Sequence, residues 1–295
     1  MQARQPEEPM GLQRLAARPS SLRFRGGRMA TPSISVQLYS VKDALNADLD
    51  DTMSKLASIG LRYVEAFDFV RRPAELRASL DRHGLAAPTG HAYLVSEEIS
   101  RADGSVTRVP SIEETFAAAK HVGLDMVIDP FVAPERWTSL EEVKETAKKL
   151  NTAAAVGAEH GLTVGYHNHD HELRPRIDGR PSLEVLTDYL DEAVQLEVDL
   201  YWAAAAGVEL VSLLDRLGDR VAAVHVKDGT LGDHVGWGKI PTGQLPAGDG
   251  EVPLDSALAA ANSARYAVIE FDAYDGDVFE AIASSYRYLE QKGLQ

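Results

Sequence analysis

The chain has 295 residues, 44% hydrophobic and 25% charged, which suits a globular protein of one large domain or two small ones. The absence of cysteine excludes disulfides, thiolate metal sites and a cysteine nucleophile, so any metal must be held by nitrogen and oxygen. Six Arg lie in residues 1–28 against Glu7 and Glu8, so of the formal charge of −15 the remainder of the chain carries about −19, a field that repels nucleic acid.

The first 32 residues show no hydrophobic periodicity, and we predict a disordered leader, with a mitochondrial-type presequence as the alternative. Arg25-Gly26-Gly27-Arg28 is what a translated ribosome-binding site would give, so our hypothesis is that Met29 is the true start. Residues 33–295 are then expected to form one catalytic domain. No apolar run approaches the ~20 residues of a membrane span, and we expect a cytoplasmic protein.

From Ser33 onward the sequence repeats one unit, a short apolar strand followed by a helical pattern and then glycine and leucine. Gly60, Gly84, Gly123 and Gly161 each fit a helix C-terminus that leads into a strand. Helix starts are indicated by Ser111-x-x-Glu114 and Ser139-x-x-Glu142, and by Asp50 or Asp51 as the cap of the first helix. We predict strands near residues 34–39, 62–66, 86–91, 125–129, 162–167, 194–199, 221–227 and 266–271, and helices near 51–60, 73–83, 111–122, 139–160, 182–190, 208–217, 253–263 and 276–291.

Eight such units in about 260 residues are typical of a single (β/α)₈ TIM barrel, and a doubly wound sheet is the second choice. The barrel is favoured because each predicted strand carries a polar residue at its carboxyl end, where the ends of barrel strands meet around a mouth. These residues are Gln37, Glu65, His91, Asp129, His167, Asp199, His225 and Glu270. Residues 92–110 and 228–250 are long connections on the same side, and the second contains Trp237 and many glycines, as in a loop that closes over a ligand.

Four of these polar ends, from strands five to eight, suggest a metal site. His167, Asp199, His225 and Glu270 provide two imidazoles and two carboxylates, a set suited to Mn²⁺, Co²⁺ or Zn²⁺ and tolerable for Mg²⁺. Without a cation, burial of two carboxylates together would cost several kcal/mol or force one of them to take up a proton, and a divalent ion removes that cost. His169 shares the facing of His167 and is the alternative ligand.

Several segments resemble the xylose isomerase-like sugar-phosphate isomerase/epimerase family over nearly the whole chain from Ser33. The segments are residues 36–43 (VQLYSVKD), 64–65 (VE), 166–172 (YHNHDHE), 198–199 (VD), 225–228 (HVKD), 248–251 (GDGE), 269–270 (IE) and 285–289 (SYRYL). The resemblance implies a barrel with a divalent metal at its mouth, Mn²⁺ being our first choice, and Asp199, His225 and Glu270 match three of the family's ligands. His167 stands where many of these epimerases have a glutamate.

On that resemblance we expect a metal-dependent isomerase or epimerase that acts on a ketose, keto-sugar or cyclitol through a metal-stabilised enediolate. Glu270 is the expected base, and Lys227 and His91 are candidates to polarise the carbonyl or to bind hydroxyl groups. The candidate substrate-binding residues are Gln37, Glu65, His169, Trp202 and Trp237. Because a metal-bound imidazole is a poor second base, we expect a one-base transfer or an elimination of water rather than inversion at a single centre.

Three other readings remain open. The nearest is a lyase that dehydrates a keto-sugar or inosose, a reaction that the resemblance also allows. Phosphodiester cleavage as in endonuclease IV would need more metal ligands and a basic surface, and a non-catalytic sugar-binding barrel would need no metal. The expected partner is a small carbohydrate, with no nucleic acid and no membrane, and a homo-oligomer is left open.

Overall fold

The computed structural model describes residues 31–100, 105–232 and 242–295. The predicted leader, apart from residues 31 and 32, and Trp237 lie outside these ranges.

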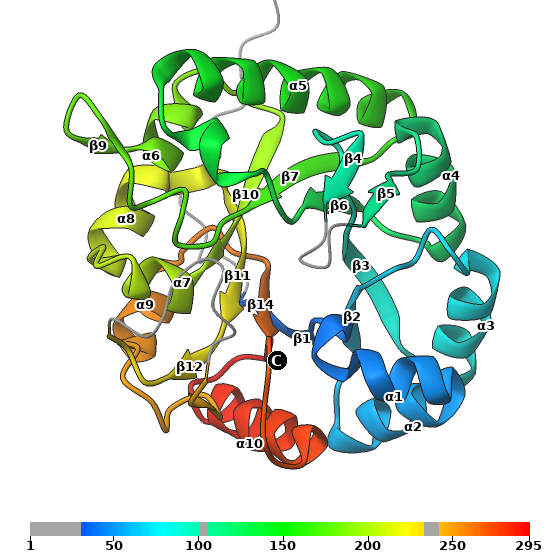
Figure 1. Cartoon of the computed structure of the whole chain (residues 1–295). Helices are drawn as coiled ribbons and strands as arrows, with labels where there is room; N and C mark the ends of the chain where they lie inside the picture. Colours follow the sequence, from blue (N-terminus) through cyan, green and yellow to red (C-terminus); the bar gives the residue numbers. More distant parts are fainter. Residues whose placement is uncertain (1–30, 101–104, 233–241) are drawn as a thin grey trace, which may run out of the picture.

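Eight parallel strands form the centre of the molecule, and helices surround them in a ring (Figure 1). The order β1-β14-β11-β10-β7-β6-β3-β2 is that of a barrel opened between β1 and β2, and a single parallel bridge from Gln37 to Glu65 joins those two strands. This confirms the predicted TIM barrel and all eight strands. The strands are β1 (Ser33–Val36), β2 (Tyr63–Ala66), β3 (Ala86–His91), β6 (Met126–Asp129), β7 (Thr163–His167), β10 (Val194–Asp199), β11 (Val221–Val226) and β14 (Tyr266–Ile269).

Ten α-helices cover the barrel in the described part of the chain. Eight match the predicted segments, whereas α1 and α7 were not expected. They are α1 (Lys42–Ala47), α2 (Leu49–Ile59), α3 (Pro73–His83), α4 (Ile112–Val122), α5 (Leu140–Glu159), α6 (Ser182–Thr187), α7 (Leu200–Ala205), α8 (Leu210–Leu217), α9 (Leu254–Ala260) and α10 (Val278–Gln291). Within the described ranges, none of the helices is both long and apolar enough to cross a membrane.

The local signals at helix ends are mostly confirmed. Ser111 and Glu114 form a reciprocal capping box, and Ser139 accepts a hydrogen bond from the backbone of Glu142. The prediction for the first long helix was wrong, because Asp48 rather than Asp50 or Asp51 accepts the bond from the third helical residue, the backbone N–H of Asp51. The chain turns into α2 earlier than its apolar pattern indicates, since α1 directly precedes it.

Three small hairpins lie in the loops outside the barrel. They are β4 (Glu98–Ser100) with β5 (Val106–Arg108), β8 (Arg176–Ile177) with β9 (Arg180–Pro181), and β12 (Asp228–Gly229) with β13 (Gln244–Leu245). The first and third belong to the two long connections that we expected at the mouth. Three short 3₁₀ segments complete the structure, at Leu38–Val41, Pro134–Trp137 and Gly218–Arg220.

The interior of the barrel changes from apolar to polar toward the carboxyl ends of the strands. A Cβ built on Gly165 would lie 3.1 Å from Cγ1 of Ile128 and 3.4 Å from Sδ of Met126, so these two side chains fill the interior beside β7. The alternation then directs Asp129 away from the interior, where it accepts hydrogen bonds from the backbone N–H groups of Leu94, Val95 and Phe131. Asp129 therefore organises loops, and our inclusion of it among the mouth residues was wrong.

Candidate metal centre

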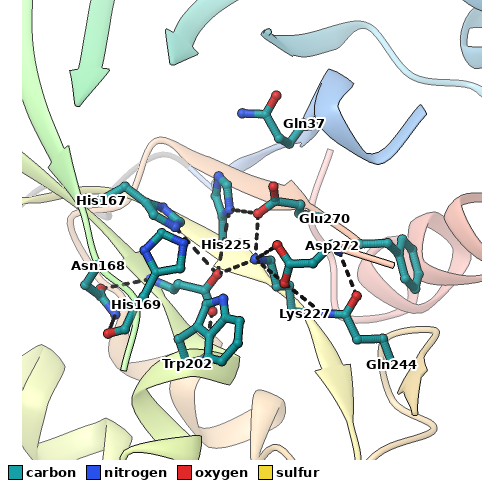
Figure 2. Close-up of polar contacts among 12 residues, drawn as sticks. Gln37, His167, Asn168, His169, Trp202, His225, Lys227, Gln244, Glu270 and Asp272 are labelled. Atoms are coloured by element: carbon teal, nitrogen blue, oxygen red, sulfur yellow. Dashed lines mark hydrogen bonds and ion pairs between the residues drawn. The ribbon is translucent and has the colours of Figure 1, made fainter. Parts of the chain in front are cut away.

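The four predicted ligands converge at the mouth of the barrel. One donor atom from each of His167, Asp199, His225 and Glu270 lies within 4.8 Å of the others, and all four residues are buried. His225 Nδ1 is 2.6 Å from Glu270 Oε2, and His167 Nε2 is 3.8 Å from Asp199 Oδ2. Figure 2 shows the side chains of His167, His225 and Glu270 directed toward a common space. The close grouping arises because these strands are neighbours, so that their carboxyl ends share one edge.

A lysine ammonium group lies in the same space. Lys227 Nζ is 2.8 Å from Glu270 Oε2 and 3.0 Å from Asp199 Oδ2, and it also contacts both oxygens of Asp272 at 3.0 Å. Gln244 in turn donates to Asp272 Oδ2 over 2.9 Å and accepts from the Asp272 backbone N–H over 2.7 Å. Lys227 thus sits among three carboxylates, and Gln244 holds the third of them in place (Figure 2).

Burial and neighbouring charges divide the titratable groups into charged and neutral sets. Burial alone would lower the pKa of His225, but the carboxylates around it outweigh this effect and raise its pKa well above the ordinary value. Burial likewise opposes ionisation of Glu270, yet the charges of Lys227 and His225 hold its pKa below the usual range. His167 stays neutral, because burial and the positive charges near it lower its pKa.

Asp199 connects the site to the helix that follows. Its Oδ1 accepts the backbone N–H of Trp202 over 2.9 Å, which makes it the N-cap of α7. Burial raises the pKa of Asp199 to about 6, although the Lys227 charge acts in the opposite direction. Asp199 Oδ2 is buried and receives no hydrogen bond within the described part of the chain, since Lys227 faces it as an ion pair without hydrogen-bond geometry.

A second polar layer lies deeper and contains three further predicted residues. Gln37 donates to Glu65 Oε1 over 2.7 Å, and the same oxygen is 3.0 Å from His91 Nε2. The two carboxylates beside His91 outweigh its burial and raise its pKa to about 10. His91, whose side chain is 10% exposed, is therefore part of a charged network that also touches His225, whose Nε2 is 2.8 Å from Glu65 Oε1.

Glu172, the last residue of the histidine-rich segment after β7, holds this segment in place by hydrogen bonds. Glu172 is fully buried and accepts from the Tyr166 hydroxyl over 2.7 Å and from the His169 backbone N–H over 2.8 Å. Burial raises the pKa of Glu172 to about 8. His169 groups with His171 and Glu172 rather than with the four mouth residues, so the geometry favours His167 over His169 as the fourth ligand.

The ring of Trp202 packs beside the site. The centroid of its ring is 5.7 Å from the centroid of the His169 ring and 5.8 Å from Lys227 Nζ. Its indole N–H is buried and has no hydrogen-bond acceptor among the described residues. This donor and the neutral imidazole of His169, whose pKa burial lowers, are suited to hydroxyl groups.

Sequence reasoning missed three residues of this region. Glu197 lies two positions before Asp199 on β10, and the two-residue alternation that selected Asp199 also places Glu197 in the interior. Asp272 follows Glu270 by two positions, beyond the end of β14. Gln244 had no signal, because only the folded hairpin β12–β13 brings it to Asp272.

The residues present fit a divalent cation. Two imidazole nitrogens and two carboxylate oxygens form an N₂O₂ donor set of the kind that binds Mn²⁺, Co²⁺ or Zn²⁺. The buried Asp199 Oδ2 receives no hydrogen bond from the described residues and faces only ion-pair contacts, so it can accept a cation. A cation bound there must share Asp199 and Glu270 with the ammonium group of Lys227, whose second partner is Asp272.

Comparison with known proteins gives one family match and several relatives. Residues 53–291 match the family described as xylose isomerase-like TIM barrel. An inosose dehydratase from Geobacillus kaustophilus (strain HTA426) is 28% identical over 191 residues. That alignment covers 61% of this chain and 61% of the length of the relative.

Solved structures share the fold at low identity. A sugar phosphate isomerase/epimerase from Parabacteroides distasonis ATCC 8503 aligns with a TM-score of 0.69 at 17% identity, over 90% of this chain and 96% of that one. The IOLI protein with a bound zinc atom aligns with a TM-score of 0.66 at 16% identity, over 88% and 97% respectively. At such identities the likeness concerns the fold.

Proposed function

Since the chain belongs to the xylose isomerase-like TIM barrel family, we propose that it is a divalent-metal-dependent sugar isomerase or epimerase that acts on a ketose, keto-sugar or cyclitol. The observation that carries the proposal is the convergence of His167, Asp199, His225 and Glu270 at the barrel mouth. A bound zinc atom in a structural relative, reported for the IOLI protein, supports a metal in this fold. When bound, such an ion supplies Lewis-acid polarisation of a substrate carbonyl.

Glu270 is the residue that we assign as the base. Its contacts with His225 and Lys227 both end on Oε2, which leaves Oε1 as the oxygen for a substrate proton. The low pKa of Glu270 keeps it ionised, although the same charges weaken it as a base. The transfer therefore needs a substrate whose proton is made acidic by an adjacent polarised carbonyl.

Lys227 and the aromatic side of the site bind and orient the substrate in this proposal. The Lys227 ammonium lies between Glu270 and Asp272, and with three N–H donors it can also donate to a substrate oxygen. Trp202 and His169 face the remaining hydroxyl groups. Asp199, the second carboxylate of the set, is held by the Trp202 backbone N–H and the Lys227 ammonium, and the neutral His167 imidazole is a poor proton acceptor, which favours one-base transfer.

Elimination of water is the second candidate, because the curated relative is an inosose dehydratase. It uses the same first step, removal of a proton next to a carbonyl, and differs in the loss of a hydroxyl group afterwards. Lys227 would then donate a hydrogen bond to the departing oxygen. Its carboxylate neighbours raise its pKa well above the ordinary value, against the effect of burial, so the group stays charged but is a weak proton donor until substrate and metal change its surroundings.

The test is a screen of keto-sugars and cyclitols with Mn²⁺ in D₂O, followed by proton NMR. Isomerisation exchanges or moves a proton with no loss of mass, whereas dehydration produces a new unsaturated product. Glu270→Gln should remove the activity, and Lys227→Met should weaken dehydration more than proton exchange. Clean inversion at one carbon with full deuterium incorporation and an active Glu270→Gln variant would refute the assignment of the base. A purified protein that binds no divalent ion would contradict the proposed function as a whole.

A further inference from the structure

Glu197 lies at the centre of three histidines, directly below the four mouth residues. Its Oε2 is 2.7 Å from His91 Nε2, 3.0 Å from His225 Nε2 and 3.1 Å from His167 Nδ1. The side chain is buried, with 1% of the residue exposed. In the hydrogen bonds with His91 and His167 the imidazole N–H donates, because an ionised carboxylate can only accept. The His225 contact is an ion pair, and the hydrogen bond of His225 Nε2 goes to Glu65 Oε1 over 2.8 Å.

The two ligand histidines each face Glu197 with one ring nitrogen and the mouth with the other. His167 uses Nδ1 toward Glu197 and Nε2 toward Asp199 Oδ2, at 3.1 and 3.8 Å. His225 uses Nε2 toward Glu197 and Nδ1 toward Glu270 Oε2, at 3.0 and 2.6 Å. A neutral imidazole has one N–H and one lone pair, so the nitrogen that carries the proton decides whether the other can bind a cation.

We propose that Glu197 is a positioning residue that holds the protons of both ligand histidines on their inner nitrogens and so presents two lone pairs to a divalent cation at the mouth. The proposal rests on the proposed metal site. It requires opposite tautomers, with the proton on Nδ1 of His167 and on Nε2 of His225, and Glu197 Oε2 lies within 3.1 Å of both nitrogens. A carboxylate that accepts the second N–H of a ligand histidine fixes the orientation of the ring and strengthens the ligand.

Glu65 does not fill the same role. Its Oε1 is 2.8 Å from His225 Nε2 and accepts from Gln37, and the printed contacts of this carboxylate do not include His167. Among the described residues, Glu197 is therefore the carboxylate that contacts the inner nitrogens of both imidazoles, and Glu65 supports the same proton of His225. The alternative is that Glu197 only balances the positive charge of His91, in which case its loss would leave cation affinity unchanged.

The experiment measures Zn²⁺ binding to the metal-free full chain by calorimetry. Glu197→Met removes the acceptor at similar volume and should weaken Zn²⁺ binding by about 10- to 100-fold. Glu197→Gln keeps a carbonyl oxygen that can accept a hydrogen bond, so its Zn²⁺ affinity should lie between those of Glu197→Met and the wild type. Glu184→Gln is the matched control, because Glu184 is also a buried carboxylate but pairs with Arg216 on the outside of the barrel, and it should retain wild-type affinity.

A second measurement reads the tautomers directly. In the Zn²⁺-loaded wild type, nitrogen NMR of labelled histidines should show the proton on Nδ1 of His167 and on Nε2 of His225. In Glu197→Gln the His167 signal should move toward mixed tautomers, and the His225 signal should move less, because Glu65 Oε1 still accepts from His225 Nε2. This readout serves even if Glu197→Met fails to fold.

The outcomes separate this proposal from the proposed function. Absence of Zn²⁺ binding to the wild type overturns both. Wild-type binding with unchanged affinity in both Glu197 variants, or a His167 proton on Nε2, overturns the positioning role and leaves the mouth site intact. A stoichiometry of two Zn²⁺ ions per chain, with one ion lost in Glu197→Met, would mean that Glu197 binds a metal rather than imidazole protons. This result would also overturn the positioning role.

Discussion

Replacement of Lys227 by Met tests whether the mouth needs a cation. The ammonium group lies within 3.0 Å of oxygens of Asp199, Glu270 and Asp272, and the side chain is 1% exposed. Methionine has a similar volume, so the change removes the charge and leaves no large cavity. In the metal-free protein three carboxylates then lose their shared partner.

The expected loss follows from the cost of an uncompensated buried charge. Breaking a buried ion pair by removing one partner costs about 3–5 kcal/mol. For a protein of this size class, about 2–4 °C of Tm corresponds to each kcal/mol, so we expect the metal-free variant to melt about 6–20 °C below the wild type. The loss should grow as pH rises, because at low pH the carboxylates can take up protons instead.

A divalent ion should reverse this loss. Mn²⁺ at 100 times its Kd adds about 2.7 kcal/mol to a folded state that binds it. The variant should gain more than the wild type at equal Mn²⁺ concentration, because the ion no longer competes with the ammonium group for Asp199 and Glu270. The assay is calorimetric melting with and without Mn²⁺, and Lys149→Met, whose ammonium donates to the Val95 carbonyl, is the control. Equal melting of Lys227→Met and wild type without metal, or equal gains with Mn²⁺, would refute the reasoning.

Three further changes test other parts of the structure. Glu172→Gln should become more stable relative to the wild type as pH rises from about 4.5 to about 8. In this range the wild-type Glu172 carboxyl holds a proton in the folded state but not in the unfolded state, so the wild type loses stability as pH rises. Denaturant titrations at several pH values measure the difference. Gly250→Ala should cost about 1–3 kcal/mol by overpacking, because its Cβ would lie 2.1 Å from Asp228 Oδ1; an unchanged Tm would contradict this. Asp199→Ala and Asp199→Asn should both lose metal binding, but only Ala should lose the α7 cap, at about 0.5–2 kcal/mol of unfolding free energy.

Much of the fold was predictable because the sequence repeats its local signals. Gly60, Gly84 and Gly123 adopt positive φ at helix ends, where the sequence places glycine before an apolar strand. We did not predict helix α7, because no loop separates it from β10. Asp199 is both the last residue of the strand and the N-cap of the helix. The alternating pattern of β10 indicates the facing of Asp199 but not its second role as a helix N-cap.

The site was predictable where strand alternation holds and unpredictable where it ends. His167, Asp199 and His225 follow from the facing of their strands, and Glu197 would have followed from the same rule; Glu270 directly follows the last residue of β14, one step before the alternation is lost. Asp272 lies past the last residue of β14, where the alternation no longer applies. Asp129 shows the opposite failure, because Met126 and Ile128 face the barrel interior, so the alternation directs the last side chain of β6 outward.

The two polar layers together explain how so many acids are buried in one barrel. Glu65 and Glu197 in the lower layer face His91 and His225, whose imidazoles the carboxylates hold in the protonated form against the effect of burial. Binding of a cation at His225 Nδ1 requires loss of the proton that now points to Glu270, while the proton on Nε2 can remain with the lower layer. The lower acids therefore retain a hydrogen-bond donor from His225 in both states, and only the mouth exchanges a proton for a metal charge.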